Sequence, residues 1–373
     1  MVSISVIIVN YNARYFLKNC IGSVLSSDIV DRIEIIVVDN HSTDGSCDML
    51  QRDFPQVICL KNEENLGFSK ANNRGVAAAK GKYVLILNPD TILSETTLSD
   101  ILNFSEHQTG FGAAGLQFID GSGKFLPESK RNFPNLKVAG AKLLGYSKYY
   151  YANHIDKDEI AEIDILTGAF MFINSKVYEE VGGFDEDFFM YGEDIDLSYR
   201  ISEAGYKNYY VGSTKVLHFK GESTVKDKFY LTNFYGALSI FYKKHFPNSR
   251  ALYYLVDFFI NTMISLKSVS ISDGSKRSTQ FNTYGYLGDD EEFLEKMKIK
   301  FPSSKVERYI EISDQLKNVE IVFFDSSFMP YKDIIEAIDN PLLEKVKKRI
   351  IYHDHSFYLG SDSSDERGEV VQL

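Results

Sequence analysis

The N-terminal part of the chain alternates between short apolar runs and longer amphipathic stretches. Four apolar, β-branched runs end in polar residues and predict buried strands: residues 3–10, 33–39, 57–61 and 83–88. The stretches between them have helical spacing: residues 16–27, 46–54 and 69–79. Because strands and helices alternate, the pattern predicts an α/β domain with a mostly parallel central sheet.

Polar residues follow the predicted strands at the edge where parallel sheets bind their ligands. They are found in four places: Asn10-Tyr11-Asn12, Asp39-Asn40, residues 62–68 and Asn88-Pro89-Asp90. Asp and Asn are also common in turns and helix caps, so one such strand end means little. Four of them at one edge predict a polar ligand site.

The pattern is less regular after about residue 110. Gly, Pro and Tyr are frequent at residues 121–151, which predicts an insertion. We expect a strand within residues 163–173, a short helix at 175–181 and a strand at 208–211. Aromatic-rich helical stretches follow at residues 229–246 and 251–266.

The last part of the chain predicts a second, smaller unit. Polar residues at 268–285 are interpreted as a linker. Helical and strand-like patterns then recur at residues 291–300, 319–324, 331–338 and 349–352. The sequence therefore predicts four parts: a large N-terminal domain at 1–224 with the polar strand ends, a helical segment at 225–267, the linker, and a small α/β module at 286–373.

Composition narrows the classes of function. The net charge of −11 argues against nucleic-acid binding, because a phosphate backbone selects for clustered Lys and Arg. Three cysteines without metal-ligand spacing fit a reducing cytosol. The first residues carry no basic leader and no run of 18 apolar residues occurs, so we expect a cytoplasmic protein without a full membrane span.

Asp90 is the first candidate metal ligand. Pro89 fixes the backbone between Asn88 and Asp90, so both side chains can point into one cleft. Mg²⁺ or Mn²⁺ takes one or two protein carboxylates and fills its other positions with phosphate oxygens and water. The alternative is that Asn-Pro-Asp-Thr forms an ordinary turn.

The densest acidic cluster lies at residues 185–196. Acids at a helix N-terminus complement the macrodipole, and Asp196 with Arg200 forms an ordinary i,i+4 pair. These structural roles do not explain Glu193-Asp194, which follow an aromatic run. Partial burial there would raise the pKa of a carboxyl group towards that of a useful general base. We therefore expect Asp194 to be a general base.

His218 is the remaining candidate, in the segment Val216-Leu217-His218-Phe219. A lone histidine beside apolar neighbours is usually structural. Its candidacy as a metal ligand depends on which residues accompany it.

The motifs taken together resemble glycosyltransferase family 2, and most closely its rhamnosyltransferase-like members in bacterial polysaccharide synthesis. The resemblance covers seven stretches in order: residues 3–12, 37–46, 65–68 with 72–73, 87–91, 167–171, 183–185 and 192–197, and it ends near His218. It implies an inverting enzyme of the A-type glycosyltransferase fold.

The resemblance also implies roles for individual residues. Asp39 would contact the donor base, and residues 65–73 would line the nucleotide pocket. Asn88 and Asp90 stand at the family's Asp-any-Asp motif, with Asn in place of the first acid. Asp194 falls on the catalytic base and His218 on a metal ligand of some members. The expected site residues are, for catalysis, Asp194 and Glu193; for nucleotide-sugar binding, Asn10, Asn12, Asp39, Asn65, Phe68, Asn72, Asn73, Asn88 and Asp90; and for the metal, Asp90 and His218.

The resemblance implies transfer of a sugar from a nucleotide-diphosphate donor to a hydroxyl of a glycan or lipid-linked acceptor in cell-surface polysaccharide synthesis. The donor stays open among nucleotide-linked sugars, UDP-sugars included, and the resemblance favours dTDP-rhamnose. Mg²⁺ or Mn²⁺ is the expected cofactor. Residues 225–266 either lie in the plane of the inner face of the cell membrane or pack on this domain or a second subunit, as in a homodimer. Two alternatives stay open: a catalytically weak binding partner, and a nucleotidyltransferase, although the Gly-rich phosphate loop of that class is missing after the first strand.

Overall fold

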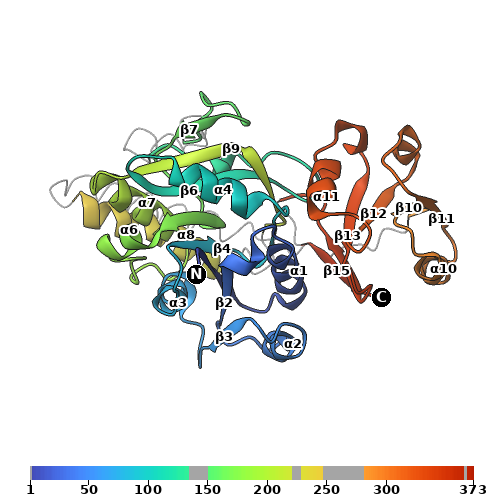
Figure 1. The fold of residues 1–373 in the computed structure, drawn as a ribbon, viewed down its shortest axis with the longest axis horizontal. Helices are drawn as coiled ribbons and strands as arrows, with labels where there is room; N and C mark the ends of the chain where they lie inside the picture. The colour runs from blue at the N-terminus through green and yellow to red at the C-terminus, as the bar shows by residue number, and fades with distance from the viewer. Residues whose placement is uncertain (1, 134–149, 221–227, 247–280, 365–367) are drawn as a thin grey trace.

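The computed structural model describes residues 2–133, 150–220, 228–246, 281–364 and 368–373. The predicted helix at 251–266, most of the predicted linker and residues 134–149 of the predicted insertion lie outside these ranges. Two β-sheets organise the described residues (Figure 1). We call residues 2–246 the first unit and residues 281–373 the C-terminal module.

The first half of the large sheet is parallel, as predicted. Its strands are β1 (Ile4–Asn10), β2 (Ile33–Asp39), β3 (Ile58–Lys61) and β4 (Tyr83–Leu87), in the order β3-β2-β1-β4. They are joined by α1 (Arg14–Leu25), α2 (Ser46–Asp53) and α3 (Gly67–Ala77). Alternate β1 side chains enter different cores, with Ile8 on one face and Ile7 on the other, so the strand is covered on both sides. The expectation that β3 is buried was wrong, because this edge strand is partly exposed.

The second half of the large sheet is mixed. The order continues β4-β8-β6-β9-β5, with β5 (Thr91–Ile92), β6 (Phe111–Ile119), β8 (Phe170–Asn174) and β9 (Lys207–His218); β7 (Ile160–Glu162) pairs with β9. The helices here are α4 (Thr97–Glu106), α6 (Ser175–Glu180), α7 (Glu193–Glu203) and α8 (Lys228–His245). The strand predicted at 208–211 is much longer and contains His218 as its last residue.

The C-terminal module is a second α/β sheet in the order β11-β10-β12-β13-β14-β15. Its first four strands are parallel: β10 (Thr283–Leu287), β11 (Lys305–Tyr309), β12 (Ile321–Asp325) and β13 (Lys347–Ile351). The antiparallel strands β14 (Phe357–Gly360) and β15 (Glu369–Gln372) complete it, with helices α10 (Glu291–Lys300) and α11 (Tyr331–Ile338). β10 begins within the stretch interpreted as a linker.

One hydrophobic core joins the module to the first unit. It includes Phe16, Ile92 and Phe219 of the first unit and Tyr331 and Ile334 of α11. In Figure 1, α11 lies nearer the large sheet than α10 does. Within the described ranges, no helix is both long and apolar enough to cross a membrane.

Candidate active site

Asn10 and Asp39 form a rigid pair at the carboxyl edge of the large sheet. They are opposite each other in the β1–β2 register, and Asn10 Nδ2 donates to Asp39 Oδ2 at 2.9 Å. The Ser42 N–H donates to Asp39 Oδ1 at 2.9 Å, and Asp39 is almost fully buried. The carboxylate is therefore fixed before any ligand arrives.

Three of the predicted nucleotide-binding asparagines shape the surrounding loops. Asn12, in a left-handed conformation with φ 53°, accepts the Thr43 N–H at 2.8 Å. Asn65 Oδ1 accepts the Gly67 N–H at 3.0 Å. Asn73 Oδ1 accepts the Tyr178 hydroxyl at 2.6 Å, and its amide donates to a backbone carbonyl at 2.9 Å. Since the oxygen of each one serves a local contact, direct nucleotide contact by these side chains stays a prediction.

The start of α3 connects Asp39 with the acidic cluster. Asn40, next to Asp39, donates to Gly67 O at 3.0 Å, and the Phe68 N–H donates to Phe189 O at 2.7 Å. A Cβ placed on Gly168 would lie 3.5 Å from the Phe68 ring and 3.6 Å from Asp194 Cβ. The start of α3, which carries Phe68, and the start of α7, which carries Asp194, therefore both lie next to Gly168.

The Asn88 backbone lies at the same place, because its N–H donates to Ala169 O at 3.0 Å. β4 ends at Leu87 opposite Ile8, so Asn88 and Asp90 continue beyond the strand beside the end of β1. Asn72 is fully buried on α3, where its Nδ2 donates to Phe68 O at 3.0 Å. The structure thus gathers the predicted residues from β1, β2, β4 and α3 along one edge.

Asp90 and His218 face each other at the end of this edge. Asp90 Oδ1 lies 3.3 Å from His218 Nε2, and both side chains are more than nine-tenths buried. β5 pairs with β9 in antiparallel fashion, and the Phe219 N–H donates to Asp90 O at 3.0 Å, which fixes the two residues relative to each other. Adjacent ligands on an octahedral Mg²⁺ lie about 3 Å apart, so the pair fits a divalent cation.

Glu193 and Asp194 begin α7 and have different environments. Burial, together with the neighbouring Asp194, raises the pKa of Glu193 from its ordinary value of 4.5 to about 8. Asp194 Oδ2 accepts from Arg131 at 2.7 Å and from the Gly168 N–H at 3.2 Å. Asp194 Oδ1 accepts the Ile195 N–H at 2.8 Å and keeps a lone pair for another donor. The group whose pKa burial raises is thus Glu193, whereas we expected this effect to favour Asp194 as the base.

Arg131 and Glu128 also belong to the site, although the sequence pattern did not predict them. Arg131 is buried, which alone would lower its pKa, but the neighbouring Asp194 carboxylate outweighs burial, raises the pKa above its ordinary value and keeps the guanidinium charged. Glu128 forms an ion pair with Lys220 at 2.6 Å. Burial alone would raise the pKa of Glu128, but the charges of Lys220 and His218 outweigh burial and hold this pKa below its ordinary value. Both residues lie in or beside the short 3₁₀ helix Pro127–Ser129, within the insertion that the sequence left uninterpreted. No motif spacing in the sequence indicates that either residue belongs to the site.

Buried polar atoms without a hydrogen-bond partner concentrate at this edge. Among the described residues, such atoms include Asn10 Oδ1, Asn72 Oδ1, Asp90 Oδ1, Arg131 Nε, Glu193 Oε2 and His218 Nδ1. Native proteins leave few buried polar groups unsatisfied, because each costs about 1–3 kcal/mol. Their concentration here indicates a site built to receive a polar ligand.

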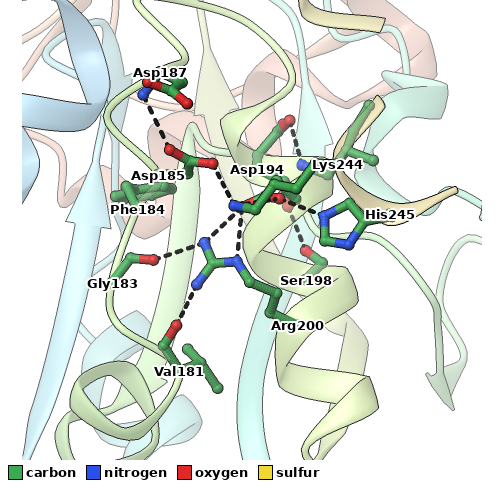
Figure 2. Close-up of polar contacts among 12 residues, drawn as sticks. Val181, Gly183, Phe184, Asp185, Asp187, Asp194, Ser198, Arg200, Lys244 and His245 are labelled. Atoms are coloured by element: carbon green, nitrogen blue, oxygen red, sulfur yellow. Dashed lines mark hydrogen bonds and ion pairs between the residues drawn. The ribbon is translucent and has the colours of Figure 1, made fainter. Parts of the chain in front are cut away.

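Asp196 has the structural role that the sequence predicted. Its carboxylate pairs with Arg200 at 2.6 Å and with His245 at 2.6 Å. Figure 2 shows that Arg200 also reaches the carbonyl oxygens of Val181 and Gly183, and that Lys244 meets Asp185. This network fastens the end of α8 to α7. A hollow of about 390 Å³ beside it includes Asn73 and Arg200 but neither Asp90 nor Asp194, so we place no reactive chemistry in it.

The fold and the acidic edge are those of a nucleotide-sugar transferase, and the comparisons agree. The model of the family described as "Glycosyl transferase family 2" matches residues 5–182. The chain belongs to this family, is a glycosyltransferase, and has an A-type glycosyltransferase-like α/β fold with a mixed, mostly parallel sheet and a second C-terminal sheet.

Individual relatives are similar over different shares of the chain. The N-acetylglucosaminyl-diphospho-decaprenol L-rhamnosyltransferase of Mycobacterium tuberculosis is 30% identical over 241 residues, which span 60% of this chain and 78% of the relative. Rhamnosyltransferase WbbL of Escherichia coli is 32% identical over 41% of this chain and 61% of its own length. The mannosyltransferase PcManGT of Pyrobaculum calidifontis, solved with GDP-Man and Mn²⁺, aligns with a TM-score of 0.46 at 17% identity, over 72% of each chain.

Proposed function

We propose that this chain is an inverting glycosyltransferase that moves a sugar from a nucleotide diphosphate to an acceptor hydroxyl in cell-surface polysaccharide synthesis. One observation carries the proposal: the Arg131–Asp194 pair and the Asp90–His218 pair border the same sheet edge, where buried polar atoms lack partners among the described residues. The Asp194 carboxylate of the first pair suits proton transfer, and the carboxylate and imidazole of the second pair suit a cation.

Asp194 is the general base in this proposal. Its Oδ1 takes the proton of the acceptor hydroxyl while the acceptor oxygen attacks the anomeric carbon from the face opposite the leaving diphosphate, so the configuration inverts. Arg131 and the Gly168 N–H hold Asp194 Oδ2 and thereby orient the carboxylate. Glu193, with its raised pKa, keeps a proton near neutral pH and adds no second negative charge beside the base.

Asp90 and His218 would hold Mg²⁺ or Mn²⁺, and Asn88 stands beside them. A bound divalent cation would supply positive charge to the departing diphosphate. Asp39 would receive the nucleotide base, near Asn10 and Phe68. Asn10 Oδ1 and Asn72 Oδ1, which lack partners among the described residues, are available to ribose or base N–H and O–H groups.

The named activities of the relatives guide the choice of substrates. Two of them are rhamnosyltransferases, and one is named for a decaprenol-linked acceptor. We therefore propose dTDP-rhamnose as the first donor to test, ahead of UDP-sugars, and a lipid-linked glycan as the acceptor. We further propose that the reaction takes place at the inner face of the cell membrane.

The test measures nucleoside diphosphate release from a panel of nucleotide-sugars, with Mn²⁺, Mg²⁺ or a chelator, and with or without a lipid-linked acceptor. Asp194→Asn keeps the shape of the side chain and removes the base, so we expect turnover to fall by about 10²–10⁴-fold while donor affinity is retained. Asp187→Asn is the matched control, because Asp187 belongs to the same acidic cluster but is exposed. Unchanged turnover in Asp194→Asn would refute the base assignment, and no release from any donor would favour a binding partner instead.

A further inference from the structure

The C-terminal sheet has the topology of a ligand-binding sheet. β10 lies between β11 and β12, and the chain leaves β10 for β11 on one side but continues from β12 to β13 on the other. The strand order therefore reverses between β10 and β12. Open α/β sheets usually bind ligands at such a reversal, often as phosphates at a helix N-terminus.

Carboxylates already occupy both helix N-termini at this edge. Asp290 caps α10 by accepting the Phe293 N–H at 2.9 Å. The N-terminus of α11 is taken by Glu95 of the first unit, which accepts the N–H groups of Tyr331 at 2.7 Å and Lys332 at 3.0 Å. Acids in these positions disfavour a phosphate. The edge at α11 therefore serves as a contact with the first unit.

The segments on the other side of this contact contain His218, the last residue of β9, and Asp90, which directly precedes β5. Leu217 and Phe219, the sequence neighbours of His218, enter the core shared with α11, whereas His218 at the end of β9 faces Asp90. Ile92 of β5, two residues after Asp90, enters the same core. The candidate cation ligands thus lie one or two residues from side chains that pack on the module.

Helix α1 provides a second connection. Tyr331 of α11 donates its hydroxyl to Asn19 Oδ1 at 2.9 Å, in a buried contact. The next residue, Cys20, has its Sγ atom 3.6 Å from Asn88 O and 3.6 Å from Thr91 Oγ1. α1 therefore links α11 to the turn that contains Asp90.

We infer that the C-terminal module positions Asp90 and His218 for the divalent cation, with Ile334 and Tyr331 of α11 as positioning residues. This inference rests on the proposed function, in which that pair holds the cation. The module is thereby part of the active-site architecture, and its own carboxyl edge is used for docking.

The test compares two core truncations in the full-length protein. Ile334→Ala removes three carbons from the core shared with the first unit, and Leu294→Ala removes three from the separate core around α10. Mn²⁺ affinity is measured from the electron paramagnetic resonance signal of free Mn²⁺. We expect Ile334→Ala to weaken Mn²⁺ binding about tenfold and Leu294→Ala by less than about twofold, with near-UV circular dichroism retained in both.

Hydrogen exchange in the metal-free protein tests the coupling without the cation. Peptides spanning residues 88–93 and 214–220 should exchange faster in Ile334→Ala but not in Leu294→Ala. If Ile334→Ala does not fold, Tyr331→Phe and Glu95→Gln replace it, with the same expectations. The inference would be overturned if Ile334→Ala, or the variants that replace it, and Leu294→Ala had equal Mn²⁺ affinity and equal exchange rates in these peptides. Equal Mn²⁺ binding by Asp90→Asn and the unchanged protein would instead refute the cation assignment, while the exchange rates still decide the coupling.

Discussion

At the scale of single residues, Glu193 and Asp194 have different proposed roles because their surroundings differ. The two carboxyl groups are adjacent, yet Arg131 forms its ion pair with Asp194. Glu193 is buried, its Oε2 lacks a hydrogen-bond partner among the described side chains, and its pKa rises to about 8. A proton on Glu193 therefore leaves a single charge, on Asp194, for Arg131 to balance.

This arrangement predicts a specific pH dependence of stability. The folded protein keeps Glu193 protonated up to about pH 8, whereas the unfolded chain ionises it near 4.5. The stabilising contribution is thus complete below pH 4.5 and is lost as the pH rises towards 8. Glu193→Gln mimics the protonated form, so it should raise the free energy of unfolding at pH 8 relative to wild type by roughly 2–4 kcal/mol, and have little effect at pH 4.5.

Thermal unfolding at both pH values checks this prediction. Glu179→Gln is the control, because Glu179 is exposed on α6. An equal shift in the melting temperature of Glu193→Gln at both pH values would contradict it.

At the scale of elements, the sequence predicted the first four strands, their helices and the polar ends of the strands. Local hydrophobic period and turn chemistry suffice for these elements, because each buries its own apolar face. The sequence did not predict β5, β6 or β7, and it did not extend β9 to His218. The strand β5 has two residues and depends on pairing with β9, and the pairing of Arg131 with Asp194 joins residues far apart in the chain. Such long-range partners leave no local pattern.

The start of α3 is an element whose position depends on one glycine. Gly67 has φ +81°, and a Cβ there would lie 2.4 Å from Phe189 O. Gly67→Ala should therefore cost roughly 2–4 kcal/mol and weaken nucleoside diphosphate binding, since Phe68 and Asn72 would move with the helix.

Gly182→Ala is the matched control for this variant. Gly182 has the same φ of +81° but no atom within 4 Å of the added Cβ, so it reports backbone strain alone, about 1–2 kcal/mol. Thermal unfolding and calorimetric titration of nucleoside diphosphate separate the two effects. Equal losses in both variants would mean that the contact with Phe189 has no role in placing α3.

At the scale of the whole molecule, the two sheets share a core and several polar contacts. Lys18 of α1 pairs with Asp354 at 2.7 Å, and the Lys348 ammonium donates to Ser122 O at 2.9 Å. A Cβ on Gly123 would lie 2.1 Å from Ile338 O, which shows how closely the backbones approach. The sequence predicted two units but gave no indication of this contact, because its residues come from opposite ends of the chain.

A shared core predicts that the first unit depends on the module for its stability. Ending the chain at residue 280 would expose Phe16, Ile92 and Phe219, which are almost completely buried in the full-length protein. Burial contributes about 25 cal/mol per Å² of apolar surface, so the loss of several large side chains from the core is a substantial part of the usual net stability of about 5–15 kcal/mol. We expect the shortened chain to aggregate, and the full-length protein to unfold in a single calorimetric transition. Sedimentation and scanning calorimetry check both expectations, and a monomeric, cooperatively folded 1–280 chain would show that the shared core is dispensable.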